Sequence, residues 1–291
     1  RQGAVATAHP LATRAAAKAL HAGGTAVDAL VAASFVLTVV RPQSTGIGGG
    51  GFAVVLPPNS TEARAFDFRE TGPRLGNVKM YLDKDGRHVA KLSQRHGLAI
   101  GVPGYVKGLW VLHKKYGKRP WAELVQPGAD IARRGFRVSH KLAGAIAVTW
   151  AKLGPNAQKL LKRKDGEALR TGDILLQPKL AVTLDRIAEE GLQGFYEGIV
   201  AADIIDAART NGGHLDHEDM RIYKVKESVA LSGTWRGNVV WTMPQPSAGG
   251  AQILAMAELI DAALKKSKIK TGKGVAKALT LDAPPVMHAL I

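Results

Sequence analysis

Residues 45–52 read TGIGGGGF, and residues 67–70 read DFRE. The four consecutive glycines follow an apolar segment, and such a run marks backbone that passes very close to a neighbouring group or bends where a Cβ would clash. In the second stretch two acids, Asp67 and Glu70, flank Arg69. We therefore expect a pocket for a small anionic ligand, with Arg69 as its anchor.

The two stretches belong to one predicted β-hairpin. Residues 52–56 form an apolar run, residues 57–60 read PPNS and predict a turn, and residues 63–68 alternate as the returning strand. Because antiparallel strands bring the ends opposite the turn together, the glycine run and Arg69 are expected to be neighbours. A guanidinium holds a carboxylate through two parallel hydrogen bonds. The alternative is that Arg69 is a structural ion-pair partner of a nearby acid.

The glycine run does not match the common nucleotide-binding loops. It lacks the lysine and hydroxyl residue of a P-loop, and it precedes a strand rather than a helix. A packed helix-to-strand turn without a function is the alternative. A second glycine pair, at residues 249–250, lies at a predicted strand-to-helix turn, where backbone N–H groups can face an anion. The candidate pocket-lining residues are Gly49, Gly50, Glu70, Ser247 and Gly249.

The remaining pattern predicts a mixed α/β chain. Helices are predicted at residues 11–22, 26–39 (with Thr25 as its N-cap), 105–116, 121–134, 142–150, 177–190, 199–209 and 251–264. Further strands are predicted at residues 5–8, 225–231 and 238–243. The alternation is too irregular for a doubly wound parallel sheet and favours a largely antiparallel sheet covered by helices. We expect residues 1–291 to form a single domain.

Composition limits the classes of partner. The 291 residues are 46% hydrophobic, carry a net charge of +16 and contain no cysteine, which excludes disulfides and thiolate sites. Basic residues cluster at 159–164 and 265–273, but aromatic residues make up only 5% and do not accompany them. We therefore expect a solvated or partner-binding surface rather than a nucleic-acid groove. The longest apolar run, residues 27–40, falls short of the about 20 residues of a membrane span.

The nine histidines show no metal-ligand spacing. His214 and His217 lie three residues apart beside Asp216, Glu218 and Asp219, and we interpret this segment as a solvated acidic helix start. We expect neither a metal nor a cofactor.

The chain resembles the large subunit of the gamma-glutamyltranspeptidases, which are N-terminal nucleophile hydrolases. The resemblance covers nearly the whole chain, and the glycine run together with DFRE is its most specific part. The segments that carry it are residues 4–28, 45–52, 67–70, 101–104 (GVPG), 115–117 (KYG), 195–198 (FYEG) and 243–250 (MPQPSAGG).

This resemblance implies a four-layer αββα sandwich of the α+β type, completed by a small subunit that is cleaved from the same precursor. It also implies cleavage of gamma-glutamyl amides such as glutathione, through an acyl-enzyme on the small subunit's N-terminal threonine. The gamma-glutamyl group then passes to water, an amino acid or a peptide. Arg69 would bind the α-carboxylate of that group, and this chain would supply no catalytic residue.

Two departures from the family pattern leave alternatives open. No nucleophile segment is present in residues 1–291, and Gln245 and Ala248 stand where many members carry proline and serine. We expect the chain alone to be inactive and a partner chain to complete the pocket. The alternatives are a cephalosporin-acylase-like relative, a poly-gamma-glutamate-processing relative and a non-catalytic binder of glutamate-like ligands. The expected location is periplasmic or secreted, with the cytoplasm as the alternative.

Overall fold

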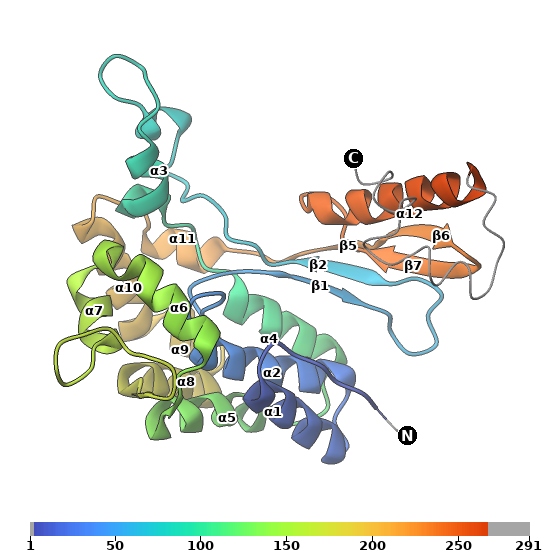
Figure 1. Ribbon diagram of the computed structural model, residues 1–291, viewed down its shortest axis with the longest axis horizontal. Coiled ribbons are helices and arrows are strands. Elements are labelled where there is room, and N and C mark those ends of the chain that lie inside the picture. The colour runs from blue at the N-terminus through green and yellow to red at the C-terminus, as the bar shows by residue number, and fades with distance from the viewer. Residues whose placement is uncertain (1–2, 267–291) are drawn as a thin grey trace. The chain divides into compact units, whose positions relative to one another are not determined.

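The computed structural model describes residues 3–266 (Figure 1). Within them the chain divides into two compact units. Unit 1 contains residues 3–51 and 68–225, and unit 2 contains residues 52–67 and 226–266. The single-domain expectation for residues 1–291 stays a prediction. Most of the predicted basic cluster at 265–273 lies outside the described residues.

Helices make up most of the described chain. The α-helices are α1 (Pro10–His21), α2 (Ala26–Val40), α3 (Ala90–Arg95), α4 (Tyr105–Tyr116), α5 (Trp121–Arg134), α6 (His140–Thr149), α7 (Pro155–Leu161), α8 (Pro178–Glu190), α9 (Gln193–Tyr196), α10 (Gly198–Thr210), α11 (His217–Ile222) and α12 (Ala248–Lys266). The 3-10 helices are η1 (Val78–Tyr81), η2 (Gly97–Ala99) and η3 (Trp150–Lys152). The strands are β1 (Phe52–Val55), β2 (Arg64–Asp67), β3 (Phe136–Arg137), β4 (Ile174–Leu175), β5 (Lys226–Val229), β6 (Leu231–Trp235) and β7 (Asn238–Thr242).

The first two helices of unit 1 begin at clear sequence signals. Pro10 occupies the first turn of α1, and the Nδ1 atom of His9 accepts the Leu11 N–H at 3.2 Å. A capping box of Thr25 and Asp28 begins α2. Because α2 is apolar on nearly every side, it is buried along most of its length, where it packs against α1 and α5. Both helices confirm the sequence prediction.

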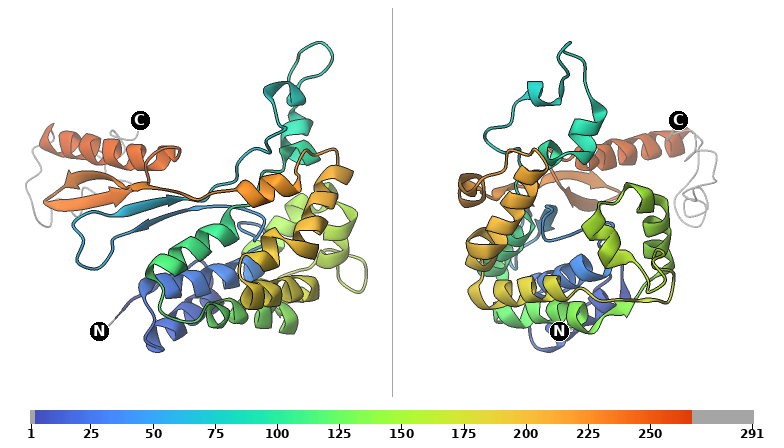
Figure 2. Two further views of the ribbon diagram at one scale, coloured as in Figure 1. Left: turned by 180° about the vertical axis from the view of Figure 1, so that it is seen from behind. Right: turned by 90° about the vertical axis from the view of Figure 1, so that its left-hand side faces the viewer.

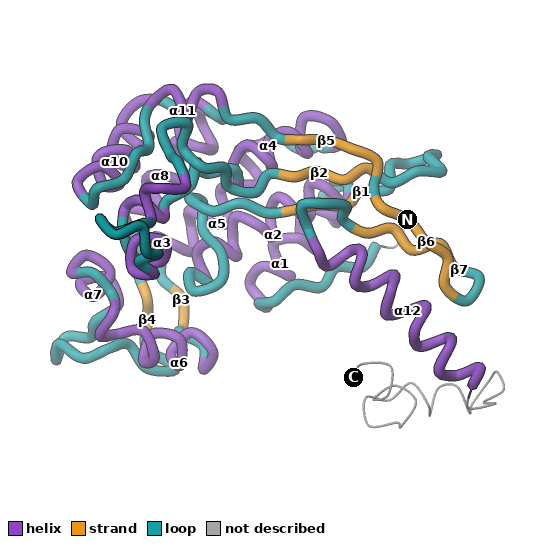
Figure 3. The backbone as a smooth tube through the Cα atoms, turned by 90° about the horizontal axis from the view of Figure 1, so that it is seen from above, coloured by secondary structure: helices purple, strands orange, loops and turns teal. Residues whose placement is uncertain are grey.

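The strands of unit 2 are all antiparallel. The order β1-β2-β5 forms one sheet and β6-β7 forms a hairpin (Figure 3). The register pairs Phe52 with Asp67 across the predicted hairpin. A small buried core of unit 2 contains Ala63, Ala65, Ala230 and Met243, and Phe52 and Trp241 pack against it.

Helix α12 packs along the β6–β7 hairpin (Figure 2). Gly233 of β6 makes this close approach feasible, because a Cβ there would lie 2.8 Å from the Leu254 side chain of α12. The mixed, antiparallel α+β class is therefore confirmed.

Some predictions for local structure were wrong or incomplete. Residues 5–8 have no strand partner, and they run as irregular chain into α1. The strand predicted at residues 225–231 was wrong at its end, because β5 stops at Val229 and pairs with β2, whereas the unpredicted strand β6 begins at Leu231 and pairs with β7. The two-residue strands β3 and β4 and the short helices α3 and α7 were also not predicted, since so few residues show no periodicity. Over residues 3–266 no helix combines the length and the apolar character required for a membrane crossing.

Candidate functional site

Phe68 anchors the segment that carries Arg69. Its backbone N–H donates to the Gly51 carbonyl at 3.0 Å, and the Gly51 N–H donates to the Phe68 carbonyl at 3.2 Å, so the hairpin ladder continues past β1 and β2. The Phe68 side chain is 4% exposed and lies on Gly108 of α4, where a Cβ would come within 2.1 Å of the ring. The predicted proximity of the glycine run and Arg69 is confirmed.

Gly50 lies directly against the backbone of Arg69. A Cβ on Gly50 would lie 2.5 Å from the Phe68 carbonyl oxygen, and 2.8 Å from both the Arg69 Cα and the Glu70 nitrogen. Because all three atoms are backbone atoms, no change of rotamer relieves the overlap. A Cβ on Gly48 would meet no atom within 4 Å. The close approach to the backbone of residues 68–70 therefore requires glycine at position 50 but not at position 48.

A second glycine loop, residues 101–104, packs on the first. The N–H groups of Gly104 and Tyr105 both donate to the Gly49 carbonyl at 2.9 Å. A Cβ on Gly101 would lie 2.9 Å from the Glu70 Cβ. The two loops therefore hold the segment after β2 between them.

Helix α11 fixes the same segment from another side. The Tyr223 hydroxyl, just after α11, donates to the Arg69 carbonyl at 2.9 Å. The Arg74 side chain donates to the Asp216 carboxylate at 2.7 Å, and the Arg74 N–H donates to Asp219 at 2.8 Å. The backbone that presents the Arg69 side chain is thus bonded at both ends.

The interpretation of residues 214–219 as an acidic helix start is confirmed, because α11 begins there, but two of its carboxylates are buried rather than solvated. Asp216 and Asp219 are 8% and 2% exposed and form a capping box at the start of α11. The backbone N–H of Asp219 and the guanidinium of Arg74 lower the pKa of Asp216, the N–H being the larger cause. No group of three or more histidine, aspartate or glutamate side chains placed to hold a metal ion is found in residues 3–266.

A cleft of about 540 Å³ opens at Arg69, and we call it the Arg69 cleft. Its lining residues are Gly48, Arg69, Glu70, Thr71, Gly72, Pro73, Tyr81, Leu98, Ala99, Ile100 and Gly101. Of these described residues, Arg69 and Glu70 alone carry a charge, and both are exposed. The Tyr81 hydroxyl donates to the Leu98 carbonyl at 3.2 Å and joins two parts of the wall.

The structure brings together some of the predicted site residues. Arg69 and Glu70 line the cleft, whereas Gly49 and Gly50 lie behind these two residues and support them. Ser247 and Gly249 belong to unit 2, where Ser247 directly precedes α12 and Gly249 lies in its first turn, and their part in the pocket stays a prediction.

Sequence reasoning missed the cleft wall at residues 71–73, 81 and 98–100. The one available signal was the GVPG segment at residues 101–104, whose glycines predict a second loop of close backbone approach.

Comparisons with known proteins agree on one family. A family model described as gamma-glutamyltranspeptidase matches residues 12–281. The chain is 38% identical over 291 residues to a glutathione hydrolase proenzyme of Escherichia coli, covering 99% of this chain and 50% of that protein. The chain thus spans about half the length of the curated relatives it matches.

Solved structures give the same result. The crystal structure of Helicobacter pylori gamma-glutamyltranspeptidase superposes with a TM-score of 0.87 at 35% identity, covering 99% of this chain and 82% of that chain. The Bacillus anthracis transpeptidase CapD superposes with a TM-score of 0.78 at 31% identity, covering 100% and 88%. The expected α+β fold of N-terminal nucleophile hydrolases is thereby confirmed.

Proposed function

Because the chain belongs to the gamma-glutamyltranspeptidase family, we propose that it is the large-subunit part of a gamma-glutamyltransferase or glutathione hydrolase. The enzyme cleaves gamma-glutamyl amides and passes the gamma-glutamyl group to water, an amino acid or a peptide. The nucleophile is the N-terminal threonine of a small subunit from the same precursor, with its own α-amine as the general base. The chain covers 50% of the length of the Escherichia coli proenzyme, and this supports a division of the protein into a large and a small subunit.

The observation that carries the proposal is the charge pair in the Arg69 cleft. A gamma-glutamyl group bears an α-carboxylate and an α-ammonium on the same carbon atom. Arg69 offers a planar guanidinium that matches the carboxylate, and Glu70 offers the opposite charge beside it. Since Gly50 and Tyr223 fix the Arg69 backbone, the clamp is held in place before a ligand arrives.

This pairing favours a glutamyl donor over the cephalosporin-acylase-like alternative. A glutaryl amide has the carboxylate but lacks the ammonium, so Glu70 would face it without a partner. The likeness to a capsule-biosynthesis protein of Bacillus anthracis keeps poly-gamma-glutamate as a second candidate donor, because its terminal residue presents a free carboxylate.

The partner chain has a candidate surface in unit 2. Large apolar side chains there are exposed, namely Val54, Leu56, Val229, Val239, Ile253, Met256 and Leu259. Within the described residues β1 and β5 are also edge strands of their sheet. Exposed apolar side chains and free strand edges are features that a partner chain commonly covers. The proposed location, periplasmic or secreted, rests on the family resemblance.

The test compares hydrolysis of gamma-glutamyl-p-nitroanilide and glutaryl-p-nitroanilide by the complete enzyme. Arg69→Ala should lower kcat/KM for the glutamyl substrate by about ten- to a thousandfold, because each 1.36 kcal/mol corresponds to a factor of ten. Arg69→Lys keeps the charge but loses the planar guanidinium fork, so its kcat/KM should lie between those of the wild type and Arg69→Ala. Glu70→Gln should lower the ratio of kcat/KM for the gamma-glutamyl anilide to kcat/KM for the glutaryl anilide.

Arg87→Gln is the matched control, because its side chain is 81% exposed and lies outside the cleft. Activity of Arg69→Ala close to that of the wild type would refute the clamp. Intact-mass analysis with N-terminal sequencing tests the other half of the proposal. A second chain that begins with threonine is expected, and a single inactive chain would instead support the non-catalytic binder.

A further inference from the structure

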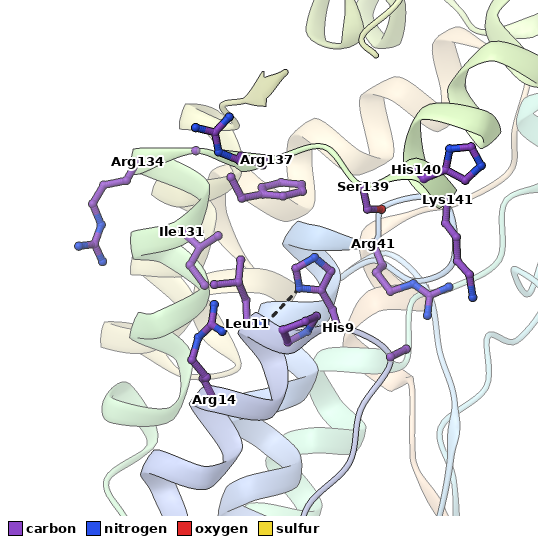
Figure 4. A pocket seen from close by; sticks show the side chains of 14 residues that line it. His9, Leu11, Arg14, Arg41, Ile131, Arg134, Arg137, Ser139, His140 and Lys141 are labelled. Atoms are coloured by element: carbon purple, nitrogen blue, oxygen red, sulfur yellow. Dashed lines mark hydrogen bonds between the residues drawn. The ribbon is translucent and has the colours of Figure 1, made fainter. Parts of the chain in front are cut away.

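A second cleft in unit 1, of about 920 Å³, shares no lining residue with the Arg69 cleft (Figure 4). Its walls come from the start of α1, the residue directly after α2, the end of α5, β3 and the start of α6. We call it the basic cleft, because it is lined by Arg14, Arg41, Arg134, Arg137 and Lys141. None of its lining residues, all of which are described, is an aspartate or a glutamate.

The charges of this cleft are only weakly compensated. Arg134 lies 3.4 Å from the Asp130 carboxylate, in a pair whose arginine side chain is 75% exposed. Arg41 donates to the Ser44 hydroxyl at 3.1 Å, a neutral acceptor. Over residues 3–266 neither Arg14 nor Arg41 forms an ion pair with an acidic side chain. A concave surface lined by one sign of charge concentrates its field on whatever enters.

His9 adds a neutral donor to the same cleft. Its Nδ1 atom accepts the Leu11 N–H, the bond drawn in Figure 4, so the proton of the neutral ring is on Nε2. Burial lowers the pKa of His9, and the charges of Arg14 and Arg41 lower it further. His140, exposed at the start of α6, is the other titratable ring of the cleft.

The basic cleft also has an apolar wall. Leu11, Ile131 and Phe136 line it together with the cations, and the Phe136 ring meets the His9 ring edge to face with centroids 6.3 Å apart. An apolar wall with a few convergent polar groups is typical of a site for a small molecule. Cations alone would attract any anion, whereas the wall selects one with an apolar part.

We propose that the basic cleft binds a small organic anion that carries two or more negative charges next to an apolar group. The anion lies beside His9, between Arg14 on one side of the ring and Arg41 on the other (Figure 4). Its apolar part lies against Leu11, Ile131 and Phe136. Phosphate and carboxylate groups both match the guanidinium fork, so the shared chemistry is that of a compact dianion. The site is independent of the proposed function, because it uses no residue of the Arg69 cleft.

The test is isothermal titration calorimetry on the complete protein at about pH 8 and low salt, where the probes are dianions. The probes are phenyl phosphate, phthalate and inorganic phosphate. We expect saturable binding of phenyl phosphate or phthalate, and whichever binds identifies the anionic group. Phenyl phosphate should bind more tightly than inorganic phosphate if the apolar wall takes part, and equal binding would overturn that part of the proposal.

The variant Arg14→Gln/Arg41→Gln should weaken binding by at least about tenfold. The control Arg87→Gln/Arg95→Gln removes the same charge from exposed residues of unit 1 outside the cleft, and its affinity should stay within about twofold. An equal loss in both variants, or no binding of either ring-bearing probe, would overturn the proposal.

A second measurement needs no variant. In the wild-type protein the NMR signals of the His9 ring should shift as phenyl phosphate or phthalate saturates, because the ring lines the cleft. Binding that leaves the His9 signals in place would show that the anion binds elsewhere, which would also overturn the proposal.

Discussion

The Arg69 cleft and the basic cleft lie in the same unit but depend on different parts of the chain. Loops that touch backbone to backbone form the Arg69 cleft, so glycines and bonds to main-chain atoms shape it. Side chains at the ends of helices form the basic cleft, and charge dominates it. The first should therefore be sensitive to added atoms and lost hydrogen bonds, and the second to lost charge.

The largest effect on stability is expected from Gly50→Ala. The new Cβ would overlap three backbone atoms of residues 68–70, and an overlap of this kind costs about 1–3 kcal/mol of unfolding free energy. Because relief requires movement of Arg69, kcat/KM for gamma-glutamyl-p-nitroanilide should also fall. Denaturant unfolding and the anilide assay measure the two effects.

Gly48→Ala, two residues earlier in the same run, is the matched control. Its Cβ would enter open space and its φ is not positive, so the unfolding free energy should change by less than about 0.5 kcal/mol. Equal destabilisation by the two alanines would contradict the backbone contact as the reason for glycine at position 50.

Asp216→Ala should have the next largest effect. It removes the N-cap of α11 and the partner of Arg74, which together should cost about 1–2 kcal/mol. Glu218→Ala is the control, because Glu218 pairs with an Arg221 side chain that is 71% exposed, and such pairs contribute little. If thermal unfolding shifted equally in both variants, Asp216 would not fasten the segment that carries Arg69.

Tyr223→Phe should have a smaller effect on stability, about 1 kcal/mol, because it removes one hydrogen bond to the Arg69 carbonyl. KM should rise more than kcat falls, since the loss loosens a group that binds substrate. Tyr105→Phe is the comparison, because its hydroxyl donates to the Ser34 carbonyl of α2, which is not part of the cleft lining. Similar changes of KM in both variants would contradict a specific role for Tyr223.

The contrast between the clefts also explains what the sequence can predict. Local signals in the sequence set the N-cap of α2, the ends of α4 and α5, and the β1–β2 hairpin. The predicted positions of these features agree with the structure within one or two residues. The same local pairing placed Arg69 beside the glycine run. Such features depend on residues close together in the sequence.

Contacts between segments that lie far apart in the sequence could not be predicted from it. The bond from Arg74 to Asp216 spans 142 positions, which is why two buried carboxylates were interpreted as solvated. Nothing local distinguishes Gly50 from Gly48, because the difference lies in the atoms that face each one. The basic cleft was missed for the same reason, since its arginines come from segments that lie far apart in the sequence.

The smallest effect should appear in the pH dependence of the basic cleft. The native pKa of His9 is lower than its value in the unfolded chain, so the unfolded chain binds more protons between the two values. The contribution of neutral His9 to the unfolding free energy is therefore fully present above about pH 6.5 and decreases as the pH falls toward the native pKa. Below the native pKa of His9, the ring should cause no further decrease in the unfolding free energy.

Arg14→Gln/Arg41→Gln should reduce this loss, because two of the three causes that lower the pKa of His9 are removed while burial remains. NMR titration of the His9 ring should show a higher native pKa in this variant, and denaturant unfolding between about pH 5 and 7 should show a flatter profile. Arg87→Gln/Arg95→Gln should leave both unchanged, because neither residue contributes to the pKa of His9. The same His9 pKa in all three proteins would mean that Arg14 and Arg41 do not act on the ring, and the positive field assigned to the basic cleft would then be absent at its centre.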